Sequence, residues 1–286
     1  MTSTTSGTTQ LPTGKPLLTL TRESEAGLWT IELHNGEDNR MSHDLIDRAL
    51  KPALDIVERE WRDQWRDAQA SSASKVKEPA NKSAGRGALI IVGKRDQNKF
   101  FSNGLDYVNA IKDPNFFKLT YNPLLARLLT YPIPVVCAIN GHCFAGGLMV
   151  ALACDFRVMT DGKERRAWCC MNEVHFGAPW PFGMAALANA KVSDARTRRL
   201  LALEGHRFSP QEALTHGLVD AVADGSSADA VYSSARKLAI AKGELAKTGV
   251  WGLIKSDLHR HTLEDIAQDY RVVMPVHADA AARSRL

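Results

Sequence analysis

The feature that most constrains the fold of this chain is an alternation of short apolar strands and helices between residues 88 and 170. The segment Ala88–Val92 reads ALIIV, which is typical of a strand buried on both faces of a parallel sheet. A strand at Val135–Ile139, a helix at 146–153 and strands at 156–159 and 167–170 follow it. This order predicts an α/β protein with parallel strands.

The flanking segments predict how this core is extended. Alternating apolar and polar residues at 17–20 and Leu28–Leu33 predict a hairpin, and Ser42 predicts the start of a helix that Pro52 makes irregular. The sequence beyond Gly183 is mainly helical in pattern. The expected organisation is a disordered tail at 1–14, a core at 15–205 with a polar solvated loop at 67–87, and a mainly helical region at 206–286.

Charge and cysteine usage limit the class of protein. Lysine and arginine number 36 against 32 acidic residues, and this excess of +4 is too evenly spread to predict binding to nucleic acid. The cysteines are odd in number and lack CxxC spacing, so we expect buried free thiols in a reducing compartment. They are Cys137, Cys143, Cys154, Cys169 and Cys170.

The first residues, MTSTTSGTTQLPTGK, contain no apolar stretch and no arginine-rich amphipathic pattern, so we expect neither a secretory nor a mitochondrial presequence. The longest apolar run, 134–154, is interrupted by a turn at 140–142, so we expect no membrane span. The last residues, Ser284, Arg285 and Leu286, are a variant of the Ser-Lys-Leu peroxisomal address. They predict recognition by the peroxisomal import receptor and hence a peroxisomal location.

Glu173 is an isolated acidic residue in a nearly uncharged run, AWCCMNEVHFG. A carboxylate between Cys170, Met171 and Phe176 experiences a low dielectric, which favours its neutral form and raises its pKa toward that of a working base. A second interpretation is a structural Glu that caps a strand end or pairs with an arginine.

Four motifs together resemble the crotonase (enoyl-CoA hydratase and isomerase) superfamily over about residues 15–225. They are FFSNGLD at 100–106, INGHCFAGGLMVALACDFRV at 139–158, NEVHFGAPWP at 172–181 and SPQEALTHGLVDAV at 209–222. The resemblance implies a spiral of β-β-α turns (the ClpP-like crotonase core) and C-terminal helices that build a homotrimer or hexamer. It also implies an acyl-CoA thioester as substrate.

The resemblance further implies an enolate whose oxygen is held by two backbone N–H groups. The first is the N–H of Leu105, after a turn at Asn103 and Gly104, and the second is that of Gly146 at the start of a helix. Tight turns and close helix packing would require the same glycines, so each glycine alone is ambiguous.

The acidic residues decide between the reactions of the superfamily. Its hydratases use two carboxylates, and Met149 stands where the first would be, which leaves Glu173. The resemblance therefore points to a Δ3,Δ2-enoyl-CoA isomerase in which Glu173 removes a proton from C2 and returns it at C4. No metal and no flavin or nucleotide cofactor is expected.

The remaining candidates concern the substrate and the base. Met149, Trp180 and Phe182 are expected to line the acyl channel, Arg40 or Lys255 to contact CoA phosphates, and His175 is a possible orienting partner of Glu173. The rival functions are an enoyl-CoA hydratase or dienoyl-CoA isomerase, a family member in secondary metabolism, and a catalytically inactive scaffold that binds acyl-CoA.

Overall fold

The computed structural model describes residues 7–73, 85–268 and 272–285. The larger sheet has the strand order β1-β2-β3-β4-β6-β8-β10, and the smaller has the order β5-β7-β9. The strands are β1 Gly7–Leu11, β2 Leu18–Glu23, β3 Leu28–Leu33, β4 Ala88–Val92, β5 Phe100–Ser102, β6 Val135–Ile139, β7 His142–Phe144, β8 Phe156–Thr160, β9 Cys169–Cys170 and β10 Ala221–Ala223.

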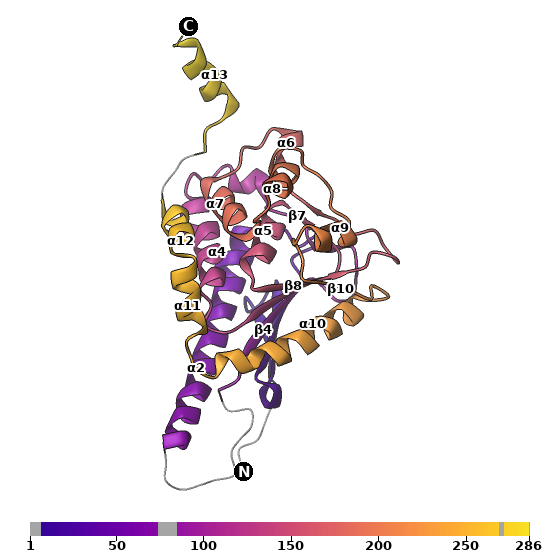
Figure 1. The fold of residues 1–286 in the computed structure, drawn as a ribbon, viewed down its shortest axis with the longest axis vertical. Helices are drawn as coiled ribbons and strands as arrows, with labels where there is room; N and C mark the ends of the chain where they lie inside the picture. The colour runs from indigo at the N-terminus through magenta and orange to yellow at the C-terminus, as the bar shows by residue number, and fades with distance from the viewer. Residues whose placement is uncertain (1–6, 74–84, 269–271, 286) are drawn as a thin grey trace.

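Helices surround both sheets (Figure 1). In the first half of the chain they are α1 His43–Leu45, α2 Lys51–Ala73, α3 Tyr107–Ala110, α4 Asn122–Leu129 and α5 Ala145–Ala153, with single π-helical segments η2 Ile46–Leu50 and η3 Phe116–Tyr121. In the second half they are α6 Glu173–Phe176, α7 Phe182–Lys191, α8 Ala195–Ala202, α9 Pro210–Thr215, α10 Ala228–Gly243, α11 Trp251–Leu258, α12 Arg260–Ala267 and α13 Pro275–Arg283. Short 3₁₀ turns are η1 Ser24–Ala26 and η4 Glu244–Ala246.

Successive strands alternate between the two sheets. The chain places β4, β6 and β8 next to one another in the larger sheet, and β5, β7 and β9, each following one of them, in the smaller sheet. All of these neighbours are parallel. This repeated β-β-α path is the predicted spiral, and the predicted fold class is confirmed.

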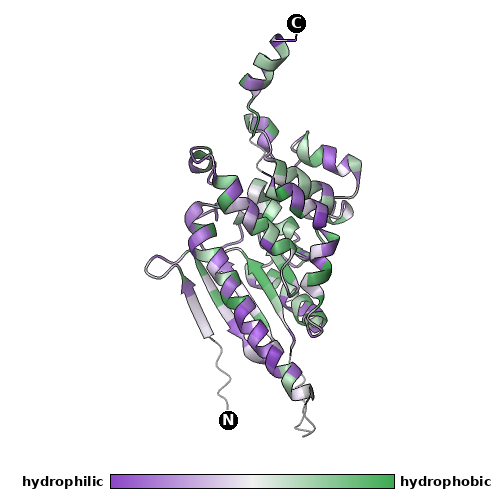
Figure 2. Cartoon of the chain, turned by 90° about the vertical axis from the view of Figure 1, so that its left-hand side faces the viewer, coloured by the Kyte–Doolittle hydropathy of each residue, from purple (hydrophilic) through white to green (hydrophobic). Residues whose placement is uncertain are grey.

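The position of strand β4 between two hydrophobic cores explains why its sequence is entirely apolar. Leu89 and Ile91 belong to the main core, whereas Ile90 and Val92 belong to a second core on the opposite face of the sheet. Helix α10 covers that second face, where Ala235 is fully buried. Figure 2 shows the apolar strands enclosed by helices whose polar sides face outward.

The predicted hairpin of β2 and β3 is antiparallel with Leu20 opposite Ile31. Ser42 caps α1 as predicted, since its side chain accepts a hydrogen bond from the Leu45 N–H. The irregularity associated with Pro52 is the π-helical segment η2, which ends directly before α2.

Two predicted boundaries differ from the structure. Residues 7–11 of the expected disordered tail form β1, which pairs with β2, because the edge of β2 offers unpaired backbone groups. The expected loop at 67–87 begins as helix, since α2 continues to Ala73 and Trp65 donates a hydrogen bond to the Lys247 carbonyl at 3.0 Å. Residues 1–6 and 74–84 lie outside the described part of the chain.

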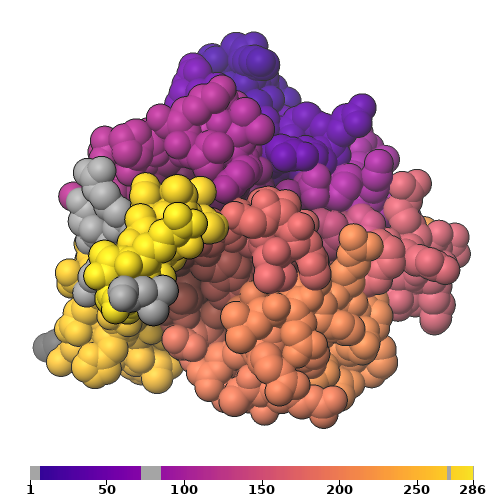
Figure 3. All heavy atoms as spheres, turned by 90° about the horizontal axis from the view of Figure 1, so that it is seen from above, coloured from indigo at the N-terminus to yellow at the C-terminus, as the bar shows by residue number. Residues whose placement is uncertain are grey.

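The C-terminal region is mainly helical as predicted, apart from the short strand β10. Helix α13 has no buried residue and projects beyond the rest of the molecule (Figure 1). Viewed from that end, α13 lies in front of the boundary between the first and second halves of the chain (Figure 3). Among the described residues, no helix is both long and apolar enough to cross a membrane.

Candidate active site

The loop that follows β5 is held at a fixed orientation by Met41. The Met41 N–H donates to the Gly104 carbonyl at 2.8 Å, and the Met41 carbonyl accepts from the Asp106 N–H at 3.2 Å. Alternate backbone groups of an extended segment point in opposite directions, so the N–H of Leu105 points away from Met41. Among the described residues no backbone group accepts a hydrogen bond from it, so it can bind a group on the other side.

The start of α5 lies against this loop. A Cβ atom added to Gly104 would lie 2.8 Å from the Ala145 Cβ and 3.6 Å from the Gly146 nitrogen. Gly146 is the second residue of α5, so its N–H has no partner within the helix. The fold therefore brings the two predicted donors, Leu105 and Gly146, to the same place.

The backbone at this helix start is unusual. Ala145 has a φ of 49°, in the left-handed region that non-glycine residues seldom adopt. Directly after it, the Gly146 carbonyl accepts a hydrogen bond of 2.6 Å from the Tyr121 hydroxyl, and Tyr121 is fully buried. Sequence reasoning missed both residues, because an alanine and an aromatic residue within a helical stripe carry no signal of such a role.

Glu173 is the first residue of α6 and is only 7% exposed. It faces a cavity of about 180 Å³ that Leu105 and Ala145 also line. The edges of the cavity are aromatic, with the rings of Tyr107 and Phe176 in edge-to-face contact at 5.6 Å. The cavity thus joins one carboxylate to the segments that carry the two free N–H groups.

Burial raises the pKa of Glu173 to about 7, as expected from the sequence. The Glu173 backbone N–H and the indole of Trp180 lower this pKa and offset only part of the rise. Among the described residues, neither Glu173 Oε2 nor Trp180 Nε1 has a partner that meets normal hydrogen-bond geometry. Within the described residues no arginine pairs with Glu173, so the arginine pair, one of the two structural roles in the second interpretation, is not present.

This pKa predicts a pH dependence of any reaction in which Glu173 is the base. Since only the ionised carboxylate accepts a proton, kcat/KM should fall about tenfold per pH unit below pH 7 and level off above it. A rate profile measured between about pH 5.5 and 8.5 checks this. A profile that stays flat across this range would exclude Glu173 as the base.

Two predicted substrate residues, Arg40 and Asn103, line the same cavity. Asp38 links them, since its carboxylate is 3.0 Å from Arg40 Nε and accepts from Asn103 Nδ2 at 2.9 Å. Gly104 lies behind them and provides the turn, with a φ of 90°.

Three predicted lining residues are placed differently. Met149 does not line the cavity but is fully buried in the main core, because α5 packs on every side. Phe182 is 40% exposed at the start of α7, and Trp180 packs against the core behind the carboxylate. The lining is instead completed by residues that the sequence did not single out: Tyr107, Phe117, Asn172, Phe176, Ala178, Pro179, Pro181 and Met184.

Two further candidates are wrong. Lys255 cannot contact CoA phosphates, because it is 5% exposed and its Nζ lies 2.8 Å from Asp155 Oδ1. His175 does not orient Glu173, because the segment is helical rather than extended and His175 Nε2 lies 3.3 Å from the Gly205 carbonyl. Within the described residues no cluster of histidine, cysteine or acidic side chains is arranged to hold a metal ion.

Comparison with known proteins places this geometry in a family. Residues 75–271 match the family model described as enoyl-CoA hydratase/isomerase. The chain is 36% identical over 175 residues to enoyl-CoA delta isomerase 3 of Arabidopsis thaliana, which covers 59% of this chain and 71% of that protein. Peroxisomal enoyl-CoA delta isomerase 2 of the same plant is 33% identical over 168 residues, which cover 56% of this chain and 68% of that protein.

Solved structures share the fold. Human mitochondrial Δ3-Δ2-enoyl-CoA isomerase has a TM-score of 0.58 at 21% identity, over 94% of this chain and 98% of that chain. An enoyl-CoA hydratase from Mycobacterium marinum has a TM-score of 0.67 at 22% identity, over 87% of this chain and 94% of that chain. The chain belongs to the enoyl-CoA hydratase/isomerase family of the crotonase superfamily.

Proposed function

We propose that this chain is an enoyl-CoA isomerase that converts 3-enoyl-CoA to trans-2-enoyl-CoA. The observation that carries the proposal is that Glu173 is the only acidic residue among the described residues lining the cavity. The two Arabidopsis relatives are also named as enoyl-CoA delta isomerases. The physiological role that follows is the oxidation of unsaturated fatty acids.

The reaction needs one group that both accepts and donates a proton. The Glu173 carboxylate removes a proton from C2, and the electron pair of the C–H bond moves toward the thioester, so that negative charge develops on its oxygen. The N–H groups of Leu105 and Gly146 stabilise this oxygen. Protonated Glu173 then returns the proton at C4, and the double bond lies between C2 and C3. A pKa of about 7 suits both steps near neutral pH.

Hydration is the main rival because the family includes hydratases. Addition of water to 2-enoyl-CoA requires one group to orient and deprotonate water and another to protonate carbon. Helix α5 has the sequence AGGLMVALA and supplies no acidic residue to the site. A dienoyl-CoA isomerase and an inactive scaffold that binds acyl-CoA are two weaker rivals.

The test of the proposal is incubation of the protein with 3-hexenoyl-CoA and measurement of the conjugated 2-enoyl thioester formed. We expect catalytic formation of this product and little hydration of 2-hexenoyl-CoA. Rapid hydration would establish a hydratase. Binding of both thioesters without turnover would establish the inactive scaffold.

Arg40 is proposed to attract the phosphates of CoA from the rim of the cavity. Because its ion pair with Asp38 is largely exposed, its contribution should be modest and screened by salt. We expect Arg40→Gln to raise KM about fivefold with kcat unchanged, and the difference to shrink at high ionic strength. Steady-state kinetics at low and high salt test this, and a fall in kcat at constant KM would contradict it.

Assembly and location are further parts of the proposal. Leu253, Ile254 and Leu258 on α11 are between 60% and 73% exposed, which supports a homotrimer or hexamer whose contacts cover them. Light scattering of the purified protein tests this state.

A peroxisomal location is supported by the names of two similar Arabidopsis thaliana proteins, the peroxisomal enoyl-CoA delta isomerases 1 and 2, while isomerase 3 of that plant is named without a location and a human mitochondrial isomerase matches as well. Of the three terminal residues that predict import, Leu286 lies outside the described residues. A tagged chain that still enters peroxisomes after removal of Ser284, Arg285 and Leu286 would disprove this signal.

A further inference from the structure

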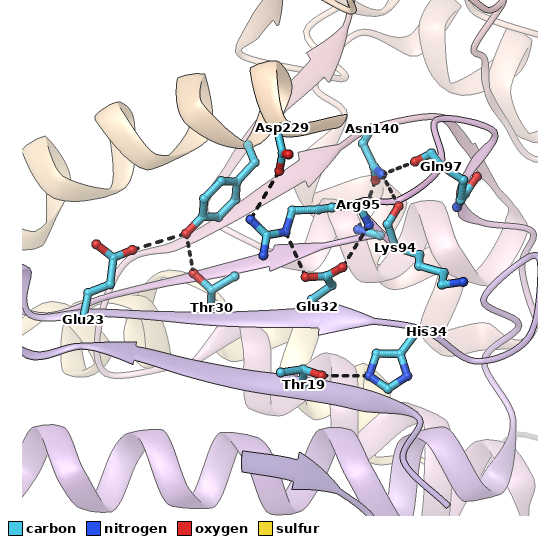
Figure 4. Close-up of polar contacts among 12 residues, drawn as sticks. Thr19, Glu23, Thr30, Glu32, His34, Lys94, Arg95, Gln97, Asn140 and Asp229 are labelled. Atoms are coloured by element: carbon cyan, nitrogen blue, oxygen red, sulfur yellow. Dashed lines mark hydrogen bonds and ion pairs between the residues drawn. The ribbon is translucent and has the colours of Figure 1, made fainter. Parts of the chain in front are cut away.

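Asn140 lies in the turn between β6 and β7 and has no exposed surface. Its Oδ1 accepts a hydrogen bond from the Gly93 N–H at 3.1 Å, and its Nδ2 donates to the carbonyls of Lys94 at 3.0 Å and Gln97 at 3.2 Å. Figure 4 shows the amide of Asn140 reaching into the loop that carries Lys94 and Gln97. One side chain therefore holds the β4–β5 loop onto the β6–β7 turn.

The side chain of Gln97 in turn forms hydrogen bonds with the start of β5. Its Oε1 accepts hydrogen bonds from the N–H groups of Lys99 at 2.6 Å and Phe100 at 3.0 Å, and its Nε2 donates to the Phe100 carbonyl at 2.8 Å. Phe100 is the first residue of β5 and pairs with His142 at the start of β7. The amide of Asn140 thus determines where both strands begin.

The two turns are also in direct backbone contact. A Cβ atom on Gly141 would lie 2.6 Å from the Lys99 carbonyl, and one on Gly93 would lie 2.8 Å from the Phe100 carbonyl. Such distances leave no room for a side chain. The relative position of β5 and β7 is therefore fixed at this end by packing as well as by hydrogen bonds.

Each of these strands leads to one of the two oxyanion donors. Leu105 follows the end of β5 by three residues, and Gly146 follows the end of β7 by two. We propose that Asn140 is a positioning residue that sets the spacing between the N–H groups of Leu105 and Gly146. This inference rests on the proposed function, in which those two groups hold the enolate oxygen.

The expected effect follows from the sensitivity of such sites to geometry. Misplacement by about 1 Å can cost about 10²-fold in rate, whereas binding of the CoA portion does not depend on this spacing. In Asn140→Asp, an oxygen replaces the amide nitrogen and faces the carbonyls of Lys94 and Gln97, so both hydrogen bonds are lost. Asn140→Ser removes the same donors without adding an acidic group.

The matched control is Arg95→Met. Arg95 lies in the same loop and is 2.8 Å from Glu32, but it makes no contact with Asn140 or Gln97 in the described hydrogen bonds (Figure 4). Its replacement destabilises the loop through its other contacts. A loss of activity that merely reflects a looser loop should therefore occur in this control as well.

The experiment measures kcat and KM with 3-hexenoyl-CoA, thermal stability, and the near-ultraviolet absorbance of bound acetoacetyl-CoA, whose enolate the two N–H groups would stabilise. We expect both Asn140 variants to lower kcat at least tenfold, to change KM less than threefold and to lose most of the enolate absorbance. Arg95→Met should match wild type in kcat and absorbance within about twofold, whatever its melting temperature.

The enolate absorbance separates this inference from the proposed function. If wild type forms the enolate but does not isomerise 3-hexenoyl-CoA, the proposed function fails, and the absorbance of the variants still tests the role of Asn140. Variants that melt earlier but keep wild-type kcat and absorbance would overturn the inference, as would equal losses in Arg95→Met. Absence of the enolate signal in wild type would overturn the inference and the two-donor site together.

Discussion

Replacement of Glu173 by glutamine is expected to lower kcat for 3-hexenoyl-CoA by about 10³-fold, with KM changed less than about threefold. The amide has nearly the shape of the carboxylate but can neither accept the C2 proton nor return it. Glu173 is the only acidic residue among the described residues lining the cavity, so no neighbour can replace it. Steady-state kinetics over a range of substrate concentrations separate kcat from KM.

The same variant is expected to gain stability, and such a gain would show that it folds. A carboxylate whose pKa is raised from 4.5 to about 7 costs the folded state about 3 kcal/mol when ionised, at about 1.4 kcal/mol per pH unit. Because the folded-state pKa is the higher one, this cost is fully present above pH 7 and disappears as the pH falls toward 4.5. Glu173→Gln should therefore be more stable than wild type at pH 8 and similar at pH 4.5.

Denaturant unfolding at both values of pH measures this difference. A variant with wild-type activity would remove Glu173 from the chemistry. A variant that is inactive and also less stable at pH 8 would mean that the carboxylate has a structural role instead.

Replacement of Gly104 by alanine is expected to lower kcat by about 10²- to 10³-fold, comparable to the loss of one oxyanion donor. Gly104 has a φ of 90°, and its added Cβ would lie 2.8 Å from the Ala145 Cβ, so the loop and the start of α5 must move apart. Leu105 and Gly146 are on the two sides of this contact. The enolate absorbance of bound acetoacetyl-CoA should fall with kcat.

Gly217→Ala is the matched control for this substitution. Gly217 has a similar left-handed φ of 69°, but no atom lies within 4 Å of its added Cβ. Both variants therefore carry backbone strain, while only Gly104→Ala disturbs the site. Equal losses of kcat in the two variants would show that backbone strain alone explains the effect and would contradict the role of Gly104.

Local patterns predicted β2, β3, β4, β6 and β8 of the larger sheet, but not its edge strands β1 and β10. The strands Ala88–Val92 and Val135–Ile139 were predicted with the bounds that the structure has, because burial on both faces requires an uninterrupted apolar run. The smaller sheet was predicted only in part: the strand expected at 167–170 contains β9, whereas β5 and β7 span three residues each and resemble turns. Their pairing depends on contacts between distant segments, which no local pattern encodes.

The residues of the site likewise fall into those that local sequence predicts and those that depend on distant segments. The environment of Glu173 was predictable because its apolar neighbours are adjacent in sequence, and the two glycine turns are visible as motifs. The roles of Met41, Tyr121 and Asn140 were not predictable, because each acts on a segment remote in the chain. The expected role of His175 failed because it assumed an extended backbone where α6 is helical.

The central claim is that one carboxylate, Glu173, both removes the C2 proton and delivers the C4 proton. The most direct test uses 3-hexenoyl-CoA carrying deuterium at C2, with the product of single turnovers in ordinary water analysed by mass spectrometry and NMR. Because Glu173 is 7% exposed, its acquired deuteron should exchange slowly with solvent, and we predict deuterium at C4 in part of the product. Product that carries only solvent hydrogen at C4 would contradict the direct return of the abstracted hydrogen by Glu173.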